Sequence, residues 1–171
     1  GLDSYIETSR CDGLADVGRG EGDTLVIAGM GGPLMERILT DGRSVWEDFK
    51  EMILQPQSDI PHFRHFLLEN GFHITEEEMI LEDGKFYPIL KVNRQTEEQP
   101  ELWSVQEEMF GRFLLERKHP VLRKYLEREL RIHEEILARL KEASGETAAK
   151  RKKEIEEERQ LILAALNRYE S

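Results

Sequence analysis

Cysteine is almost absent from this chain, since Cys11 is the single one among 171 residues. One cysteine forms neither an internal disulfide nor a thiolate zinc cluster, and it suits a reducing compartment, so we expect a cytoplasmic protein. Long apolar runs are also lacking, because none approaches the roughly 20 residues of a membrane span. The five histidines are scattered and form no HExxH-type pattern. The sequence therefore predicts no metal site and no membrane partner.

Positive charge is scarce as well, because the net charge is −11 although charged residues make up 35% of the chain. Taken alone, an acidic protein is a poor partner for nucleic acid, whose affinity depends largely on phosphate neutralisation. The lysines and arginines are clustered, however, at residues 112–131 and 150–153. A locally basic face on an acidic protein remains open.

The stretch TLVIAGMGGPLMERIL, residues 24–39, organises the rest of the chain. Its first five residues are apolar and partly β-branched, which is typical of a strand buried on both faces in a parallel sheet. A glycine-rich loop follows, and Pro33 then starts a helix that ends at Asp41-Gly42. In open α/β sheets ligands bind at the carboxyl ends of strands, where this loop lies. A tight turn that binds nothing fits the same pattern, and the loop matches neither GxGxxG nor a P-loop.

Further strands surround this unit. Residues 5–10 favour extended backbone, and Asp12-Gly13 ends that segment with a turn signal. Residues 50–54 form a short apolar strand that stops at Pro56, and Ser58 or Asp59 then caps a helix. Residues 72–81 and 85–92 flank a hairpin turn. This order of strands and helices predicts an α/β domain over residues 1–95, and the polar composition of residues 95–100 indicates a linker.

The periodicity after residue 100 is entirely helical. One helix starts near Val105 and ends or kinks at Pro120. Two longer amphipathic helices, residues 121–142 and 147–169, flank a turn at Ser144-Gly145. Their apolar spacing predicts an antiparallel coiled-coil hairpin within residues 96–171. Because such a hairpin can pair within or between chains, we expect a monomer or a weak dimer. The basic run near its tip is either a solvated face or a phosphate contact.

Several motifs together resemble one bacterial family. They are DGL at Asp12, IAGMGG at Ile27, LQP at Leu54, NGF at Asn70 and EDGKxY at Glu82. The pattern is similar to the tRNA (adenine-N1)-methyltransferases that act on the D-arm adenine at position 22. The resemblance implies a class I methyltransferase with S-adenosylmethionine as cofactor, tRNA as partner and a C-terminal coiled coil. Strands at Ile6, Val26, Ile53, Ile74 and Ile89 would then be the third to seventh of a partial Rossmann-like sheet.

The chain departs from the family pattern in three places. Cys11 stands where the family usually has glycine, and Gln57 stands where it usually has asparagine. Nothing before Gly1 corresponds to the family's first strand, its glycine loop or its ribose-binding acidic residue. We therefore expect an N-terminally truncated piece of the enzyme that does not bind the cofactor tightly alone and has little activity by itself.

The resemblance also assigns candidate residues. The cofactor would contact Asp12, Gly13, Leu14, Ala28 and Gly29. The target base and the reacting methyl would be lined by Gly29, Met30, Gly31, Gly32, Gln55 and Pro56, with Gln55 as the candidate base contact. Phosphates of tRNA would meet Arg112, Arg117, Lys118, Arg123, Lys124, Arg128 and Arg131, although each of these can instead pair with a neighbouring glutamate. Adenine N1 carries its own lone pair, so positioning rather than a strong base would drive catalysis.

Two other classes of function remain open. The first is a degenerate methyltransferase-like platform whose coiled coil binds a protein partner, which the acidic charge and the long hairpin favour. The second is a methyltransferase for a small molecule or a protein, against which the helical tail argues.

Overall fold

The computed structural model describes residues 3–94, 102–142 and 144–170. The chain forms two compact units, of which the first contains Gly1–Glu76 and Pro88–Leu102 and the second contains Glu77–Tyr87 and Trp103–Ser171. The tip of a β-hairpin therefore groups with the C-terminal helices. The predicted linker at 95–100 lies outside the described residues, and the domain boundary predicted there stays a prediction.

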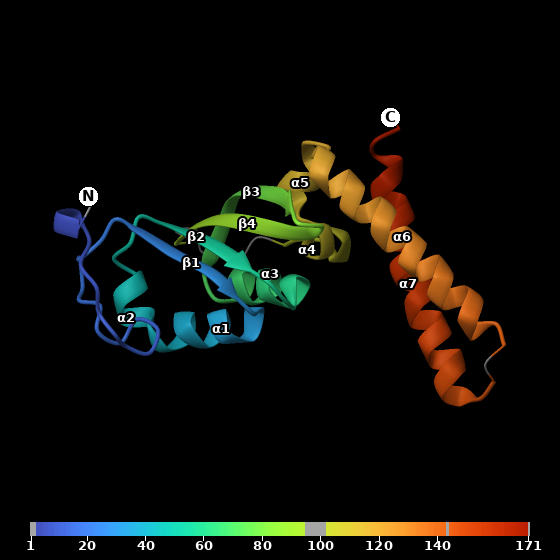
Figure 1. Ribbon diagram of the computed structural model, residues 1–171, viewed down its shortest axis with the longest axis horizontal. Coiled ribbons are helices and arrows are strands. Elements are labelled where there is room, and N and C mark those ends of the chain that lie inside the picture. Colours follow the sequence, from blue (N-terminus) through green and yellow to red (C-terminus); the bar gives the residue numbers. More distant parts are fainter. Residues whose placement is uncertain (1–2, 95–101, 143, 171) are drawn as a thin grey trace. The chain divides into compact units, whose positions relative to one another are not determined.

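The sheet has four strands in the order β1-β2-β4-β3 (Figure 1). Strands β1 (Thr24–Met30) and β2 (Glu51–Pro56) are parallel, with Ile27 opposite Leu54. Strands β3 (Phe72–Glu82) and β4 (Lys85–Arg94) form the hairpin, and β4 runs antiparallel to β2. This mixed sheet with helical connections confirms the predicted α/β class.

The described part of the first unit contains the α-helices α1 (Gly32–Asp41), α2 (Arg43–Trp46) and α3 (Ile60–Glu69). Helices α1 and α3 contact each other, and the apolar side chains of Met35, Leu39, Phe63 and Leu67 are buried. The short α2 is not evident from the sequence pattern. It is held by Trp46, whose buried indole nitrogen donates to the carbonyl of Leu39 over 2.6 Å.

Strand β1 is not buried on both faces as its composition predicts. Ile27 is buried, whereas Val26 on the opposite side of the strand is 63% exposed. Within the described part of the chain β1 pairs with β2 alone and stands at the edge of the sheet. The apolar composition of β1 is therefore matched by packing partners on the face with Ile27, whereas the described residues leave the face with Val26 exposed.

The strand predicted at residues 5–10 is wrong. A short 3₁₀ turn, η1 (Asp3–Tyr5), is followed by irregular chain, and the side chains of Tyr5 and Ile6 are exposed. β-Propensity forms a strand only where a neighbour offers a hydrogen-bond ladder, and this segment pairs with no described strand.

The predicted side-chain cap of α3 is also wrong. Asp59 has a left-handed φ of 51° and makes no capping hydrogen bond. The side-chain oxygen of Ser58 faces the glycine loop instead of the helix.

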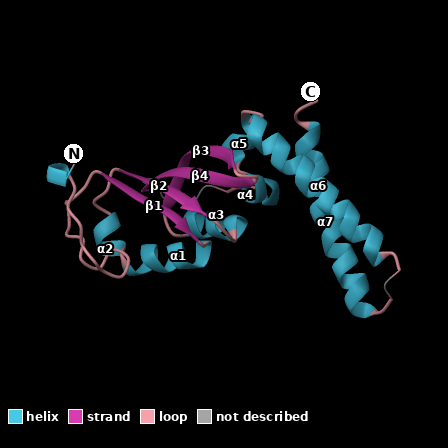
Figure 2. Cartoon of the chain, in the orientation of Figure 1, coloured by secondary structure: helices cyan, strands magenta, loops and turns pink. Residues whose placement is uncertain are grey.

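The second unit contains α4 (Val105–Phe110), α5 (Arg112–Glu116), α6 (Pro120–Leu140) and α7 (Glu146–Asn167), shown as cyan helices in Figure 2. One continuous helix was predicted up to Pro120. It is interrupted at Gly111, whose φ of 89° no helix accommodates. Ser104 and Glu107 form a capping box at the start of α4.

Helices α6 and α7 run antiparallel, as predicted. The tyrosine hydroxyl of Tyr169, after α7, donates to the carbonyl of His119, before α6, over 3.0 Å. Further along both helices, His133 Nε2 lies 2.8 Å from Glu158 Oε2. An apolar cluster joins the pair to the hairpin tip, and its members include Leu122, Leu126, Ile162, Ala165 and Met79. The coiled-coil character of the pair stays a prediction.

The contact at Tyr169 leads to a prediction about alkaline stability. Burial raises the pKa of Tyr169 to about 12, from the ordinary value of 10.0. The folded protein thus favours the neutral phenol. The resulting contribution of Tyr169 to the free energy of unfolding is complete below pH 10.0 and is lost as the pH rises through about 12.

The corresponding measurement is the free energy of unfolding between pH 9 and 12. Tyr169→Phe should be less stable below pH 10 by about 1 kcal/mol, because it lacks the bond to His119. Its stability should then fall less steeply above pH 10 than that of the wild type. The exposed Tyr5→Phe is the matched control. Parallel pH curves for Tyr169→Phe and the wild type would contradict the prediction.

Candidate functional site

Three hydrogen bonds join the end of β1 and its glycine loop to the end of β2 and the segment that follows. The Gly29 amide donates to Oε1 of Gln55 over 2.8 Å. The Gln57 amide donates to the Met30 carbonyl over 2.8 Å, and the Gly32 amide donates to the Ser58 carbonyl over 3.1 Å. Because β1 and β2 are parallel, both segments lie at the carboxyl edge of the sheet. The structure thus brings together the predicted loop and Gln55.

Packing accounts for two of the three glycines to different degrees. A Cβ on Gly31 would lie 2.7 Å from Ser58 Oγ, and a Cβ on Gly32 would lie 2.8 Å from the Ser58 carbonyl oxygen. The Ser58 side chain can rotate away from Gly31, whereas the contact at Gly32 is with backbone and excludes a side chain. The tight-turn interpretation therefore explains these two glycines without a ligand.

Gly29 is different. Its φ is +78°, and the nearest heavy atom to its Cβ position is Nε2 of Gln57 at 4.0 Å. Ala28 and Gly29 are both exposed, whereas Pro56 is buried opposite Met30. A bare, exposed patch of backbone beside two glutamine amides can receive a flat polar molecule.

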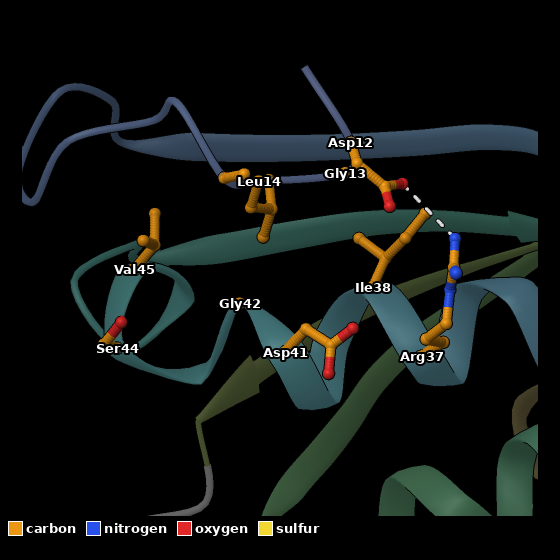
Figure 3. Close-up of a pocket in the computed structure, with 10 residues that line it drawn as sticks. Asp12, Gly13, Leu14, Arg37, Ile38, Asp41, Gly42, Ser44 and Val45 are labelled. Atoms are coloured by element: carbon orange, nitrogen blue, oxygen red, sulfur yellow. Dashed lines mark hydrogen bonds and ion pairs between the residues drawn. The ribbon is translucent and has the colours of Figure 1, made fainter.

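The other predicted cofactor residues lie in a separate cavity of about 180 Å³ (Figure 3). Asp12 Oδ1 accepts from the Arg37 guanidinium over 3.3 Å. Gly13 has a φ of +59° and lies against Ile38. Leu14 packs closely on Gly42, since a Cβ on Gly42 would lie 2.6 Å from the Leu14 side chain. The remaining lining residues of the cavity are Ala15, Asp41, Ser44 and Val45.

The predicted site residues thus fall into two groups. Residues 12–14 lie along the second half of α1, and residues 28–32 lie at its start together with Gln55 and Pro56. The described lining of the cavity includes no residue of the glycine loop. Sequence reasoning missed Arg37, which holds Asp12, and Ser58, which fixes Gly31 and Gly32. Neither residue belongs to a motif, so its role emerges only from the folded contacts.

Four of the seven predicted phosphate contacts are engaged within the protein. Arg112 pairs with Glu116 at 3.0 Å, and Arg123 pairs with Glu127 at 2.9 Å. Arg117 donates to the carbonyls of Phe113 and Glu77. Arg128 pairs with Glu129 and stacks over the ring of Phe86, with 4.7 Å between the guanidinium carbon and the ring centroid.

The other three cations are Lys118, Lys124 and Arg131. All three are exposed, and the structure records no ion pair for them among the residues that it describes. Lys124 and Arg131 are seven residues apart on α6 and therefore share a face of the helix.

Among the described residues, no group of three or more histidine, cysteine, aspartate or glutamate side chains is placed to hold a metal ion. No helix in this part of the chain is long and apolar enough to cross a membrane.

Comparison with known proteins identifies relatives. The tRNA (adenine(22)-N(1))-methyltransferase of Bacillus subtilis (strain 168) is 38% identical over 90 residues, which are 53% of this chain and 38% of that protein. The aligned segment therefore spans well under half of the curated relative.

Solved structures extend the likeness to nearly the whole chain. A crystal structure of the Bacillus subtilis m1A22 tRNA methyltransferase TrmK superposes with a TM-score of 0.80 at 28% identity, covering 96% of this chain and 72% of that one. A Streptococcus pneumoniae protein in complex with S-adenosyl-L-methionine gives a TM-score of 0.82 at 29% identity, covering 97% and 71%. An uncharacterised protein of Listeria monocytogenes serotype 4b gives 0.88 at 28% identity, covering 96% and 72%.

A family-wide sequence model decides the assignment, because its match runs through the glycine loop, both strand ends and most of the helical tail. Residues 1–163 match this model, and the chain belongs to the TrmK family, tRNA (adenine(22)-N(1))-methyltransferase.

Proposed function

We propose that the protein containing this chain transfers a methyl group from S-adenosylmethionine to N1 of adenine 22 in bacterial tRNA. The family match over residues 1–163 carries the proposal. The exposed backbone at Gly29, flanked by the amides of Gln55 and Gln57, supports it, because a planar base fits such a surface. We infer that the reaction takes place in the cytoplasm.

The residues of the cavity fit the adenine end of the cofactor. The Asp12 carboxylate can accept from an exocyclic amine, and Gly13 leaves its backbone accessible because it has no Cβ. These residues and Leu14 would hold the cofactor, with Ala28 and Gly29 toward the reacting end. The Streptococcus pneumoniae relative in complex with S-adenosyl-L-methionine supports the choice of cofactor.

Positioning is the task of the residues at the sheet edge. When bound, the cofactor supplies an electrophilic methyl group on a sulfonium. Adenine N1 would attack the methyl carbon with its own lone pair while the carbon–sulfur bond breaks and the neutral thioether leaves. No prior deprotonation would be needed, so a loop of small residues suffices. Gln55 fixes the loop through the Gly29 amide, and its own amide nitrogen remains on the opposite side as a donor. Freeing the base from its stack and holding it here would supply most of the rate.

We propose that Lys118, Lys124 and Arg131 are the phosphate contacts of the tail, since the other four candidates already have protein partners. Charge reversal of Lys124 and Arg131 to glutamate should lower tRNA affinity by about 10-fold, because two phosphates lose their contact with a protein cation and the release of counterions that accompanies it. The slope of log affinity against log salt should shrink by about one per contact. Titration of labelled tRNA at several salt concentrations measures both quantities.

Arg43→Glu is the control, because it reverses one cation in the same way, with half the total charge change, at an exposed position of the first unit. An unchanged affinity in the double variant, or an equal loss in Arg43→Glu, would contradict the assignment of these contacts.

The proposed reaction is tested with the full-length protein, unmodified bacterial tRNA and labelled S-adenosylmethionine. Mass spectrometry of the digested tRNA identifies the labelled nucleoside, and we expect 1-methyladenosine. Label in protein or small molecules, or no label in tRNA although the folded protein binds the cofactor, would refute the proposal.

A further inference from the structure

The side chain of Gln57 is placed beside the open patch of backbone at Gly29. Its amide nitrogen lies 4.0 Å from the Cβ position of that glycine. Its backbone amide donates to the Met30 carbonyl over 2.8 Å, which holds the residue next to the loop. The side chain is exposed, and within the described residues no hydrogen bond is recorded for its amide. One donor and one acceptor are therefore available at the site.

Gln55 cannot play the same part. Its Oε1 accepts from the Gly29 amide over 2.8 Å, so the carboxamide is held against the loop and only one lone pair of that oxygen is left for a ligand. Of these two glutamines, Gln55 within β2 and Gln57 just after it, Gln57 is the one whose carboxamide has no recorded hydrogen bond among the described residues. The two residues thus have different roles although they are separated only by Pro56.

The chemistry of the target limits how adenine can be held. N1 must face the methyl group, so the Watson–Crick edge cannot be covered by the protein. The free polar edge is then the one with N6 and N7, which offers a donor next to an acceptor. A glutamine carboxamide matches this edge with two hydrogen bonds, from N6 to Oε1 and from Nε2 to N7.

We propose that Gln57 selects adenine by binding its N6 and N7 atoms while N1 stays free to react. This inference rests on the proposed methylation of adenine N1 and adds the residue that discriminates the base. Guanine presents two acceptors, O6 and N7, along the same edge, so its O6 would oppose Oε1 of Gln57. A specificity contact, not a proton transfer, is the role assigned to this side chain.

A substrate in which one atom is replaced tests the contact. tRNA is prepared with adenosine or 7-deazaadenosine at position 22, which removes the N7 acceptor. Single-turnover rates divided by apparent Kd are compared for the full-length wild type and for Gln57→Met, which keeps the length of the side chain but forms no hydrogen bonds. The intrinsic reactivity of N1 changes equally for both proteins and cancels in the ratio.

With the wild type, 7-deazaadenosine loses one bond of a bidentate contact, whereas Gln57→Met makes no such bond with either base. We therefore expect the preference for adenosine over 7-deazaadenosine to be roughly 10-fold larger in the wild type than in Gln57→Met. Gln57→Asn, which keeps a shorter carboxamide, should retain part of that preference. Gln55→Met should react slowly but keep the full preference, because it disturbs the loop and not the base contact. Unfolding curves and cofactor affinity verify that each variant is folded.

Equal preference ratios in the wild type and in folded Gln57→Met would overturn the inference while leaving the methylation itself intact. Should Gln57→Met not fold, the same comparison with Gln57→Leu decides, because leucine also forms no hydrogen bonds, and an undiminished preference there counts against the contact. Absence of methylation on every tRNA would overturn the proposed function and the inference together.

Discussion

Gly32→Val is expected to destabilise the protein by about 3 kcal/mol, since overpacking and a lost buried hydrogen bond add together. Gly32 is buried at the first turn of α1, and a Cβ there would lie 2.8 Å from the Ser58 carbonyl oxygen and 3.3 Å from Cβ of Phe63. The turn at Ser58 must move to admit the side chain, which breaks the bond from the Gly32 amide. Because this turn also holds Gln57, methyl transfer should fall on the order of 100-fold.

Denaturant unfolding and single-turnover rates of the full-length protein measure both effects. Leu34→Val is the matched control, because it places the same β-branched residue on an exposed position of the same helix. It should cost no more than about 0.5 kcal/mol of helix propensity. A Gly32→Val protein that matches this control in stability and rate would show that the loop and the Ser58 turn are not packed together.

Glu77→Ala is expected to lower the free energy of unfolding by about 3 kcal/mol, because a buried backbone donor loses its carboxylate acceptor. Glu77 is 1% exposed, and its Oε2 accepts from the Phe113 amide over 3.1 Å. That amide belongs to the first turn of α5, which has no other side-chain cap. The break at Gly111 leaves the first amides of α5 without intrahelical acceptors, and the Glu77 carboxylate accepts from one of them. In Glu77→Ala that amide has lost its acceptor.

Loss of helical circular dichroism during denaturant unfolding measures this effect. Glu77→Gln keeps an oxygen acceptor and should recover a large part of the stability. Glu82→Ala, at an exposed position of the same strand, should change stability by no more than about 0.5 kcal/mol. Equal costs at Glu77 and Glu82 would refute the capping role.

Local patterns were sufficient for most of the first unit. The change from strand to helix at residues 24–41 was predictable because Pro33 and Gly42 mark the two ends of α1. The hairpin was predictable from Asp83-Gly84, because both residues adopt positive φ, 49° and 75°, as a two-residue turn requires. These signals act through backbone preferences of one or two residues.

Elements that depend on distant contacts were not predictable. Residues 5–10 have strand composition, yet the described structure offers them no ladder. The break at Gly111 is stabilised by Glu77, which lies more than thirty residues earlier. A glycine inside a helix lowers helix stability by only about 1 kcal/mol relative to alanine. Gly111 alone therefore does not tell a weakened helix from an interrupted one.

The candidate site divides in the same way. Residue types at the sheet edge were predicted, because glycines and amides after parallel strands are a local pattern. The bond from Gly29 to Gln55 and the pairing of Asp12 with Arg37 depend on register and on helix position. For this reason the sequence did not separate the cavity at residues 12–14 from the glycine loop.

The most direct test of methylation at N1 of adenine 22 uses two unmodified tRNA transcripts that differ only at that position. One carries adenine 22 and the other guanine, and each is incubated with the full-length protein and S-adenosylmethionine before nucleoside mass spectrometry. We predict 1-methyladenosine from the first transcript and none from the second. Equal methylation of both transcripts, a different methylated nucleoside, or no product from a protein that binds the cofactor would contradict the account.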